Sequence, residues 1–204
     1  MGVAKIVLLT GGGRSGKSSY AERLAERRPG TRIYLATALP LDEEMKARIA
    51  AHRASRARAG WMTWEEPLFL ARAIRDCPSP GTVVVDCLTM WVNNLLWQAQ
   101  RGGPAATGSP TLPTEDDIRA ACTEIVEACR CREGLVILVT NEVGLGIIPG
   151  DPLTRLYRDL LGRCNQVMAA AADAVVFMIS GLPLVLKDEG DLVGSPGTVL
   201  DPSE

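Results

Sequence analysis

The sequence predicts a single α/β domain with a mostly parallel sheet, helices on both faces and a short antiparallel edge. Short apolar runs alternate along the chain with longer segments of helical periodicity, which is the order that parallel sheets produce. Residues 11–18 read Gly-Gly-Gly-Arg-Ser-Gly-Lys-Ser directly after the first apolar run. This segment fits the phosphate-binding pattern G-x-x-x-x-G-K-S in its strand-loop-helix context and predicts a P-loop NTPase-like fold.

Five apolar runs are predicted as core strands because they are β-branched or apolar at consecutive positions, as expected where helices cover both faces. They are Lys5–Thr10, Arg32–Thr37, Thr82–Asp86, Leu135–Thr140 and Ala174–Ser180. Ligands of open α/β sheets bind outside the carboxyl ends of the strands. The segments that follow the strands are therefore the first candidates for a site, namely Gly11–Ser18, Thr37–Leu39, Asp86–Thr89 and Asn141–Gly146.

Helical patterns separate these strands. The predicted helices are Lys17–Arg28, Asp42–Arg58, Pro67–Asp76, Leu88–Gln100, Thr114–Arg130 and Pro152–Ala171. Two further short segments, Leu182–Lys187 and Gly197–Leu200, are expected to form the antiparallel edge as a hairpin. The Gly- and Pro-rich segment Arg101–Thr114 is expected to be a surface loop. We expect one P-loop domain over residues 1–187 and a polar tail with little core potential over residues 188–204.

The composition narrows the classes of function and partner. The 204 residues carry a formal net charge of −2, which gives no electrostatic reason to expect a nucleic-acid partner. The six cysteines form no C-x-x-C pair, so their spacing does not predict a zinc site. No apolar stretch is long enough to span a bilayer, and the N-terminus enters a core strand without a charged lead or cleavage site. We expect a soluble, cytoplasmic protein.

The glycine-rich loop predicts triphosphate chemistry. Glycines allow backbone N–H groups to turn inward around a phosphate chain, and the following helix directs its positive end to the same anion. The pattern assigns Lys17 to the β- and γ-phosphates and the Ser18 hydroxyl to Mg²⁺. The residues expected to cradle the nucleotide phosphates are Gly11, Gly12, Gly13, Arg14, Ser15, Gly16, Lys17 and Ser18.

Asp86 is the second candidate for the metal. It ends the apolar run Val83-Val84-Val85, as does the acidic residue that helps to hold Mg²⁺ in many P-loop proteins. An aspartate in this place can instead cap the next helix. Beside a P-loop, we favour the metal role. The segment Thr140-Asn141-Glu142-Val143-Gly144 lacks the lysine and aspartate of the guanine-reading N-K-x-D motif, which argues against a switch GTPase.

His52 is the only histidine and lies in a basic helical segment. Arg48 and Arg56 lie one turn on either side of it, and their charges favour the neutral imidazole. A neutral imidazole among cations suits nucleophilic attack on a phosphate. The residues alone equally allow an exposed histidine on a basic amphipathic helix, and a lone histidine does not make a metal site.

Taken together, these segments resemble the bifunctional adenosylcobinamide kinase / adenosylcobinamide-phosphate guanylyltransferase family of cobalamin biosynthesis. The matching segments occur in the family's order and cover most of the chain. They are Thr10–Ser18, Tyr34–Ala38, Asp42–Met45 with Arg48-Ile49-x-x-His52, Trp61-x-Thr63-x-Glu65, Asp86–Thr89, Val139–Pro149, Arg158–Gln166 and Ala172–Asp173. The Thr-Asn-Glu-Val-Gly-Leu-Gly-Ile-x-Pro run is the most specific of them, whereas Gly13 stands where alanine is common in the family.

The resemblance implies two activities at one nucleotide site. The first phosphorylates the aminopropanol hydroxyl of adenosylcobinamide. The second transfers GMP from GTP to that phosphate and gives adenosyl-GDP-cobinamide and pyrophosphate. In the family, a histidine at the position of His52 attacks the α-phosphate and carries GMP as a phosphoramidate. The resemblance therefore makes His52 and Lys17 the expected catalytic residues. It also implies that the enzyme uses GTP and Mg²⁺, with ATP as an alternative phosphoryl donor in the kinase step.

The resemblance also assigns nucleotide contacts outside the phosphate loop and implies a homotrimer with sites near the subunit boundaries. The assigned residues are Thr37, Ala38, Leu39, Arg53, Ala54, Ser55, Arg56, Glu65 and Asp86. Two other functions stay open: a P-loop small-molecule kinase that leaves His52 unmodified, and a nucleotide-binding regulatory module. The base of the kinase step also stays open between Glu142 and Asp159, because an acidic group near the strand ends can accept a hydroxyl proton.

Overall fold

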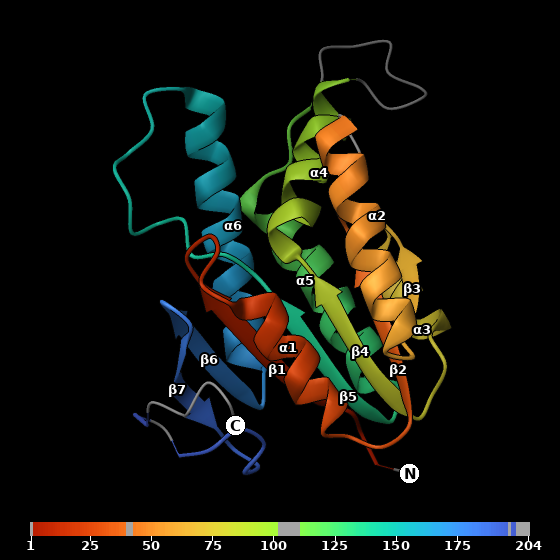
Figure 1. Ribbon diagram of the computed structural model, residues 1–204. Coiled ribbons are helices and arrows are strands. Elements are labelled where there is room, and N and C mark those ends of the chain that lie inside the picture. Colours follow the sequence, from red (N-terminus) through yellow and green to blue (C-terminus); the bar gives the residue numbers. More distant parts are fainter. Residues whose placement is uncertain (1, 40–42, 102–110, 196, 199–204) are drawn as a thin grey trace.

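A seven-stranded sheet with the strand order β3-β2-β4-β5-β1-β6-β7 forms the centre of the computed structural model (Figure 1). The structure describes residues 2–39, 43–101, 111–195 and 197–198, and within residues 43–58 it describes side chains at positions 43, 46, 50, 53, 54 and 56–58. The strands are β1 (Lys5–Gly11), β2 (Thr31–Ala36), β3 (Met62–Glu65), β4 (Gly81–Asp86), β5 (Gly134–Val139), β6 (Ala174–Ile179) and β7 (Leu182–Asp188). All neighbouring pairs are parallel except β6 and β7, which are antiparallel.

Helices cover both faces of the sheet. They are α1 (Lys17–Glu26), α2 (Glu43–Arg58), α3 (Leu70–Asp76), α4 (Leu88–Gln100), α5 (Glu115–Arg130) and α6 (Pro152–Ala171). Figure 1 shows α1 and α2 in front of the sheet and α4, α5 and α6 behind it. The predicted α/β class, with a parallel sheet and an antiparallel edge, is confirmed.

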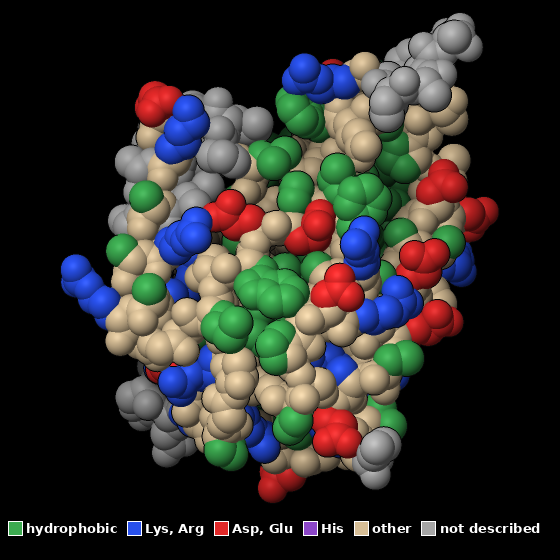
Figure 2. Space-filling model, turned by 90° about the vertical axis from the view of Figure 1, so that its right-hand side faces the viewer, with side chains coloured by type: hydrophobic (Ala, Val, Ile, Leu, Met, Phe, Trp, Pro, Cys, Tyr) green, Lys and Arg blue, Asp and Glu red, His purple; other side chains and the backbone are tan. Residues whose placement is uncertain are grey.

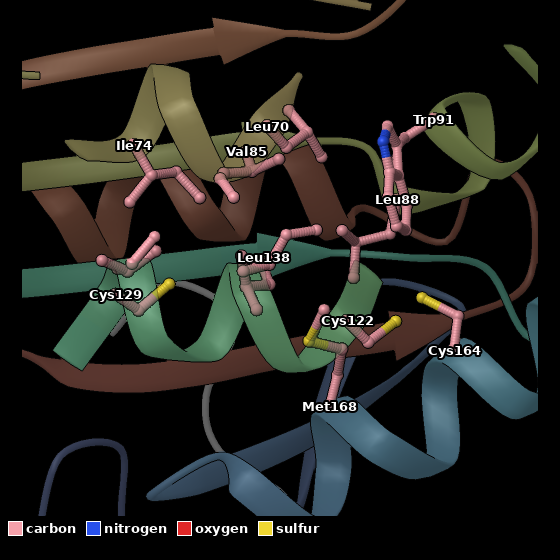
Figure 3. Close-up of a cluster of buried hydrophobic side chains, with 14 of the residues drawn as sticks. Leu70, Ile74, Val85, Leu88, Trp91, Cys122, Cys129, Leu138, Cys164 and Met168 are labelled. Carbon is pink, nitrogen blue, oxygen red and sulfur yellow. The ribbon is translucent and has the colours of Figure 1, made fainter. Parts of the chain in front are cut away.

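The sheet separates two apolar clusters because successive side chains of a strand point to opposite faces. The larger cluster joins one sheet face to α3, α4, α5 and α6, and Figure 3 shows Leu70, Leu88, Cys122 and Met168 from these helices meeting there. The smaller cluster joins α1 to the other face. Burial of these side chains stabilises the sheet and fixes where the strand ends lie.

Strand β3 is absent from the sequence prediction. It has only four residues, pairs in parallel with β2 at the edge of the sheet, and exposes Met62 and Glu65. Helix α3 also begins later than predicted, at Leu70 instead of Pro67. The reason is local, because the Glu66 carboxylate accepts backbone N–H groups of Leu68 and Phe69, each at 2.9 Å, and holds these residues in a turn.

The described part of the C-terminal segment packs against the domain more than its composition suggests. Asp188 accepts four backbone N–H groups of residues 190–194, at 2.8–3.1 Å. Leu192 and Val193 pack against the smaller apolar cluster. Val185 exchanges backbone hydrogen bonds with Gly197 and Thr198, which is the pairing expected of the hairpin, although these two residues are not in a strand. Residues 199 and 200 lie outside the described part.

The distribution of charge on the surface agrees with the small net charge of the sequence. Figure 2 shows acidic and basic side chains interspersed on the side of the molecule that is on the right in Figure 1. Across the described ranges, no helix combines the length and the apolar character needed to cross a membrane. The predicted loop Arg101–Thr114 lies mostly outside the described residues, with 111–113 forming the irregular approach to α5.

Candidate active site

The phosphate loop joins β1 to α1 at the carboxyl edge of the sheet (Figure 1). Gly11 has φ +140°, and a Cβ there would lie 2.3 Å from the backbone oxygen of Met178. Gly16 has φ +93° and precedes the first residue of α1 without a capping side chain. Only glycine fits the first position, and a positive φ favours it at the second. The amino end of α1 is thus open to an anion.

Lys17 lies inside this loop. Its Nζ donates to the backbone oxygens of Gly11 and Gly12, at 3.1 and 2.5 Å, and to Ser15 Oγ at 3.3 Å. Burial lowers the pKa of the Lys17 ammonium, while the nearby Cys87 and Asp86 oppose this effect. The ammonium is therefore held beside the loop amides, where it can exchange its carbonyl partners for phosphate oxygens.

The ends of three neighbouring strands bring two predicted acidic residues to one edge. Ala36 of β2 is in register with Glu65 of β3 on one side and with Asp86 of β4 on the other. The Asp86 carboxylate accepts a hydrogen bond from the Tyr34 hydroxyl. Ser18, the other predicted magnesium ligand, lies in the first turn of α1.

The donors present fit a hard divalent cation. Ser18 and Asp86 offer hydroxyl and carboxylate oxygens, the type that Mg²⁺ prefers. Among the residues whose side chains are described, no three His, Cys, Asp or Glu side chains gather into a metal-binding group. A magnesium ion here would take its remaining ligands from phosphate oxygens and water, as is usual for Mg²⁺ at nucleotide sites.

Thr37 is fully buried, and its hydroxyl bonds to the backbone of Cys87, the residue after β4. Thr37 Oγ1 accepts from the Cys87 N–H at 2.8 Å and donates to the Cys87 carbonyl at 2.7 Å. Asn94 of α4 donates to the backbone oxygens of Thr37 and Pro67, at 2.8 and 3.1 Å. These bonds hold together the ends of β2 and β4, so the half-buried Ala38 and Leu39 are the better placed to touch a nucleotide.

Helix α2 is tied to the site through two arginines. Arg53 forms an ion pair with Glu65 at 3.3 Å on the surface. Arg56 is 8% exposed, and its guanidinium lies 3.6 Å from the centre of the Tyr34 ring and 4.0 Å from Glu22. The structure thus brings Arg53, Arg56, Glu65 and Asp86 to one region. Ala54 is exposed on α2, and the side chains of His52 and Ser55 lie outside the described residues.

The segment after β5 begins beside the phosphate loop. The Glu142 N–H donates to the Gly11 carbonyl at 3.0 Å. Asn141 is fixed on both sides, because its N–H donates to Thr89 Oγ1 at 2.7 Å and its carbonyl accepts from Asn165 at 3.0 Å. Asp159, the other candidate base, lies on α6 and pairs with Arg158 at 3.0 Å.

The sequence predicted no role for the polar residues that support the carboxyl ends of the strands, although Tyr34, Thr89 and Asn165 lie in segments that match the family. These residues form hydrogen bonds with partners 24–57 positions away in the chain; they are Tyr34, Thr89, Asn94 and Asn165. Contacts at such separations cannot be predicted from a local sequence pattern. Asp173, in one of the matching segments, is structural. It accepts from Arg130 and from the Ile6 N–H, both at 2.7 Å, at the amino end of β1.

Two cavities, of about 480 and 250 Å³, lie at the opposite edge of the sheet. Residues at the amino ends of the strands line them, among them Pro80, Arg132 and Gly134. None of the described residues that line them is a predicted nucleotide or catalytic residue. The phosphate loop and the strand ends beside it therefore remain the candidate active site.

The parallel sheet and the phosphate loop at the carboxyl ends of its strands define a protein of the P-loop NTPase-like class. The chain resembles a KaiC-like protein from Pyrococcus horikoshii, with a TM-score of 0.52 and 14% identity over 91% of this chain and 80% of that one. A second protein from the same archaeon gives a TM-score of 0.52 at 11% identity, over 99% of this chain and 94% of that one. These similarities show the fold alone.

The sequence comparisons place the chain more narrowly. The model of the cobinamide kinase / cobinamide phosphate guanyltransferase family matches residues 7–186, and the chain belongs to this family. It is 41% identical over 183 residues to the bifunctional adenosylcobalamin biosynthesis protein CobP of Pseudomonas aeruginosa, covering 89% of this chain and 97% of the relative. It is 40% identical over 190 residues to the bifunctional adenosylcobalamin biosynthesis protein CobU of Salmonella typhimurium, covering 89% and 99%.

Proposed function

We propose that this protein phosphorylates adenosylcobinamide and then transfers GMP from GTP to the resulting phosphate, with both reactions at the one phosphate loop. Family membership supports the pair of reactions. The observation that carries the shared site is the chain of contacts from α2 to Asp86. Arg56 lies on the Tyr34 ring, and the Tyr34 hydroxyl reaches Asp86. Because His52 precedes Arg56 by about one helical turn, the helix that carries it is anchored beside the triphosphate site.

The guanylyl transfer proceeds in two steps on His52. An imidazole nitrogen attacks the α-phosphorus of GTP, the bond to the α,β-bridging oxygen breaks, and pyrophosphate leaves with that electron pair. A phosphate oxygen of adenosylcobinamide phosphate then attacks the same phosphorus, the phosphorus–nitrogen bond breaks, and the imidazole is restored. Lys17 and the loop amides stabilise the charge that develops on the phosphate oxygens. Mg²⁺, held by Ser18 and Asp86, neutralises triphosphate charge when it is bound.

The kinase step places the substrate hydroxyl against the γ-phosphorus. The hydroxyl oxygen forms the new bond, the bond to the β,γ-bridging oxygen breaks, and a base takes the hydroxyl proton. We assign this base to Glu142, because its backbone is bonded to Gly11 of the phosphate loop, whereas Asp159 is paired with Arg158. Arg14 and Ser15 in the loop, with Arg53, Ala54 and Ser55 on α2, complete the proposed nucleotide contacts.

The direct test supplies adenosylcobinamide with magnesium and one nucleotide at a time, and separates the corrinoid products by chromatography and mass spectrometry. With GTP, we expect adenosylcobinamide phosphate and then adenosyl-GDP-cobinamide. With ATP, we expect the phosphate alone. A simple kinase would stop at the phosphate with either nucleotide, and a regulatory module would give neither product.

Replacement of Asp86 is expected to weaken the use of magnesium. The Asp86→Asn variant should need roughly 10- to 100-fold more Mg²⁺ for half-maximal turnover in both reactions, because one charge is lost beside the metal. Asp76→Asn is the matched control, since Asp76 is exposed and pairs with Arg72 at 3.6 Å on the surface of α3. The alternative cap role is not seen in the structure, where Cys87 is the N-cap residue of α4 and no described side chain caps the helix. An Asp86→Asn enzyme with an unchanged rate and Mg²⁺ requirement would therefore contradict the metal role of Asp86.

Replacement of Glu142 is expected to separate the kinase step from the GMP adduct. In Glu142→Gln, phosphorylation of adenosylcobinamide should fall by about 10²-fold or more, because general-base assistance is lost. Labelling of the protein by α-labelled GTP should continue, since that step uses no substrate hydroxyl. Glu124→Gln, on the exposed part of α5, serves as the control. Equal losses in both assays would contradict the assignment.

We also propose the homotrimer that the family resemblance implies, in the cytoplasm. The segment after β5 supports an assembly, because Leu145, Ile147 and Ile148 are 78, 96 and 67% exposed, and such apolar groups favour contacts with another surface. Light scattering on the purified protein should give three times the 21.8-kDa chain mass. A mass equal to one chain at micromolar concentration would contradict this assembly.

A further inference from the structure

Tyr34 is the one described side chain that hydrogen-bonds to the Asp86 carboxylate, and the family resemblance, which includes Tyr34 in a matching segment, gives it no role. It lies on β2 in register with Val84 of β4, two residues before Asp86. Its side chain is therefore a diagonal neighbour of Asp86 on the same face of the sheet, within reach of an aromatic ring. The hydroxyl donates a hydrogen bond to Asp86 Oδ2.

The Tyr34 ring is held on two sides. Trp61 packs against it edge to face, with 6.1 Å between the ring centres and 77° between the planes. The Arg56 guanidinium lies 3.6 Å from the ring centre. Tyr34 is 5% exposed. These contacts fix the position of the Tyr34 ring and its hydroxyl. The hydrogen bond from that hydroxyl then restricts the orientation of the Asp86 carboxylate.

We propose that Tyr34 is a positioning residue for metal binding: it occupies Oδ2 of Asp86 and so presents Oδ1 to the magnesium ion of the bound nucleotide. Through the Arg56–Tyr34 contact, the same residue links this carboxylate to α2. The inference rests on the metal role of Asp86 in the proposed function. It extends the site to a residue that acts through the carboxylate.

The test measures metal binding without turnover. Mn²⁺ is titrated into the full-length protein in the presence of a GTP analogue whose α,β-bridging oxygen is replaced by a methylene group, which cannot pass GMP to His52, and free Mn²⁺ is followed by electron paramagnetic resonance. Tyr34→Phe keeps the ring and its packing and removes only the hydroxyl. We expect it to weaken Mn²⁺ binding by about tenfold and to leave binding of the analogue without metal unchanged.

Tyr20→Phe is the matched control. Tyr20 lies on α1 in the same apolar cluster, is 2% exposed, and has no hydrogen bond to Asp86 among those of the described residues. It should bind Mn²⁺ as the unmodified protein does. Equal weakening in both variants would overturn the inference, because loss of any buried hydroxyl would then produce the effect.

A double-mutant cycle with Asp86→Asn decides whether Tyr34 acts through the carboxylate. In the Asp86→Asn background, we expect Tyr34→Phe to cause no further loss of Mn²⁺ affinity. The Tyr34 hydroxyl acts through the Asp86 carboxylate, and that carboxylate is no longer there to bind the metal. Additive effects would overturn the inference. If Asp86→Asn weakens Mn²⁺ binding and Tyr34→Phe does not, the inference alone fails. If neither variant weakens it, the metal role of Asp86 fails as well.

Discussion

Lys17→Ala is expected to lose both transfer reactions. Each activity should fall by on the order of 10³-fold, because the ammonium neutralises developing phosphate charge inside a preorganised loop. The loss should be equal in the two assays because Lys17 is the lysine of the single phosphate loop and contacts Gly11, Gly12 and Ser15. Both products are measured from the same reaction by chromatography.

Lys5→Ala is the control for Lys17→Ala. Lys5 begins β1 at the opposite end of the strand, is half exposed, and pairs with Asp173 at 3.3 Å, so its loss should leave both rates near the unmodified values. A Lys17→Ala enzyme that phosphorylates adenosylcobinamide normally while losing guanylyl transfer would contradict the single shared site. Separate nucleotide sites would then be required.

His52→Ala is expected to separate the two chemistries. Attack on the α-phosphorus needs the imidazole, so covalent GMP and adenosyl-GDP-cobinamide should fall below detection. Attack of the substrate hydroxyl on the γ-phosphorus does not need it, so phosphorylation should persist at a reduced rate because Lys17, Ser18 and Asp86 remain. Incorporation of α-labelled GMP and formation of the corrinoid phosphate are measured side by side. Full adduct formation without His52 would exclude it as the nucleophile.

A second variant on α2 controls for damage to the helix. Lys46→Ala removes an exposed side chain that pairs with Glu43 at 2.6 Å in the first turns of α2. It should keep the adduct and both products. If Lys46→Ala lost the adduct as His52→Ala does, the effect would belong to the helix as a whole and not to the imidazole.

Local sequence was enough for the parts of the site that are continuous in the chain. The loop from Gly11 to Ser18 could be predicted because its glycine positions and its lysine are set by one turn between a strand and a helix. Gly11 and Gly16 have the positive φ angles that this turn requires. Asp86 could be singled out for a similar reason, because the four consecutive residues Val83–Asp86 are enough to indicate a buried strand that ends in a carboxylate.

The rest depends on contacts across the sheet. Strand β3 was missed because Met62–Glu65 is short and lies at an edge, where pairing with β2 decides its conformation. Tyr34 lies in a matching segment but received no role, because an aromatic residue in an apolar strand is expected in any core. The β2–β4 register and the hydrogen bond show that its hydroxyl reaches Asp86. The family resemblance supplied Arg53, Arg56 and Glu65, and the structure supplied their contacts.

The central claim is that GMP passes through His52 on its way to the corrinoid. Protein labelled with α-labelled GTP and magnesium is freed of nucleotide and then mixed with adenosylcobinamide phosphate, and the label is followed with time. We expect an acid-labile, alkali-stable protein adduct whose label moves quantitatively into adenosyl-GDP-cobinamide, at least as fast as steady-state turnover. An adduct that keeps its label on mixing, or turnover without any adduct, would contradict the account.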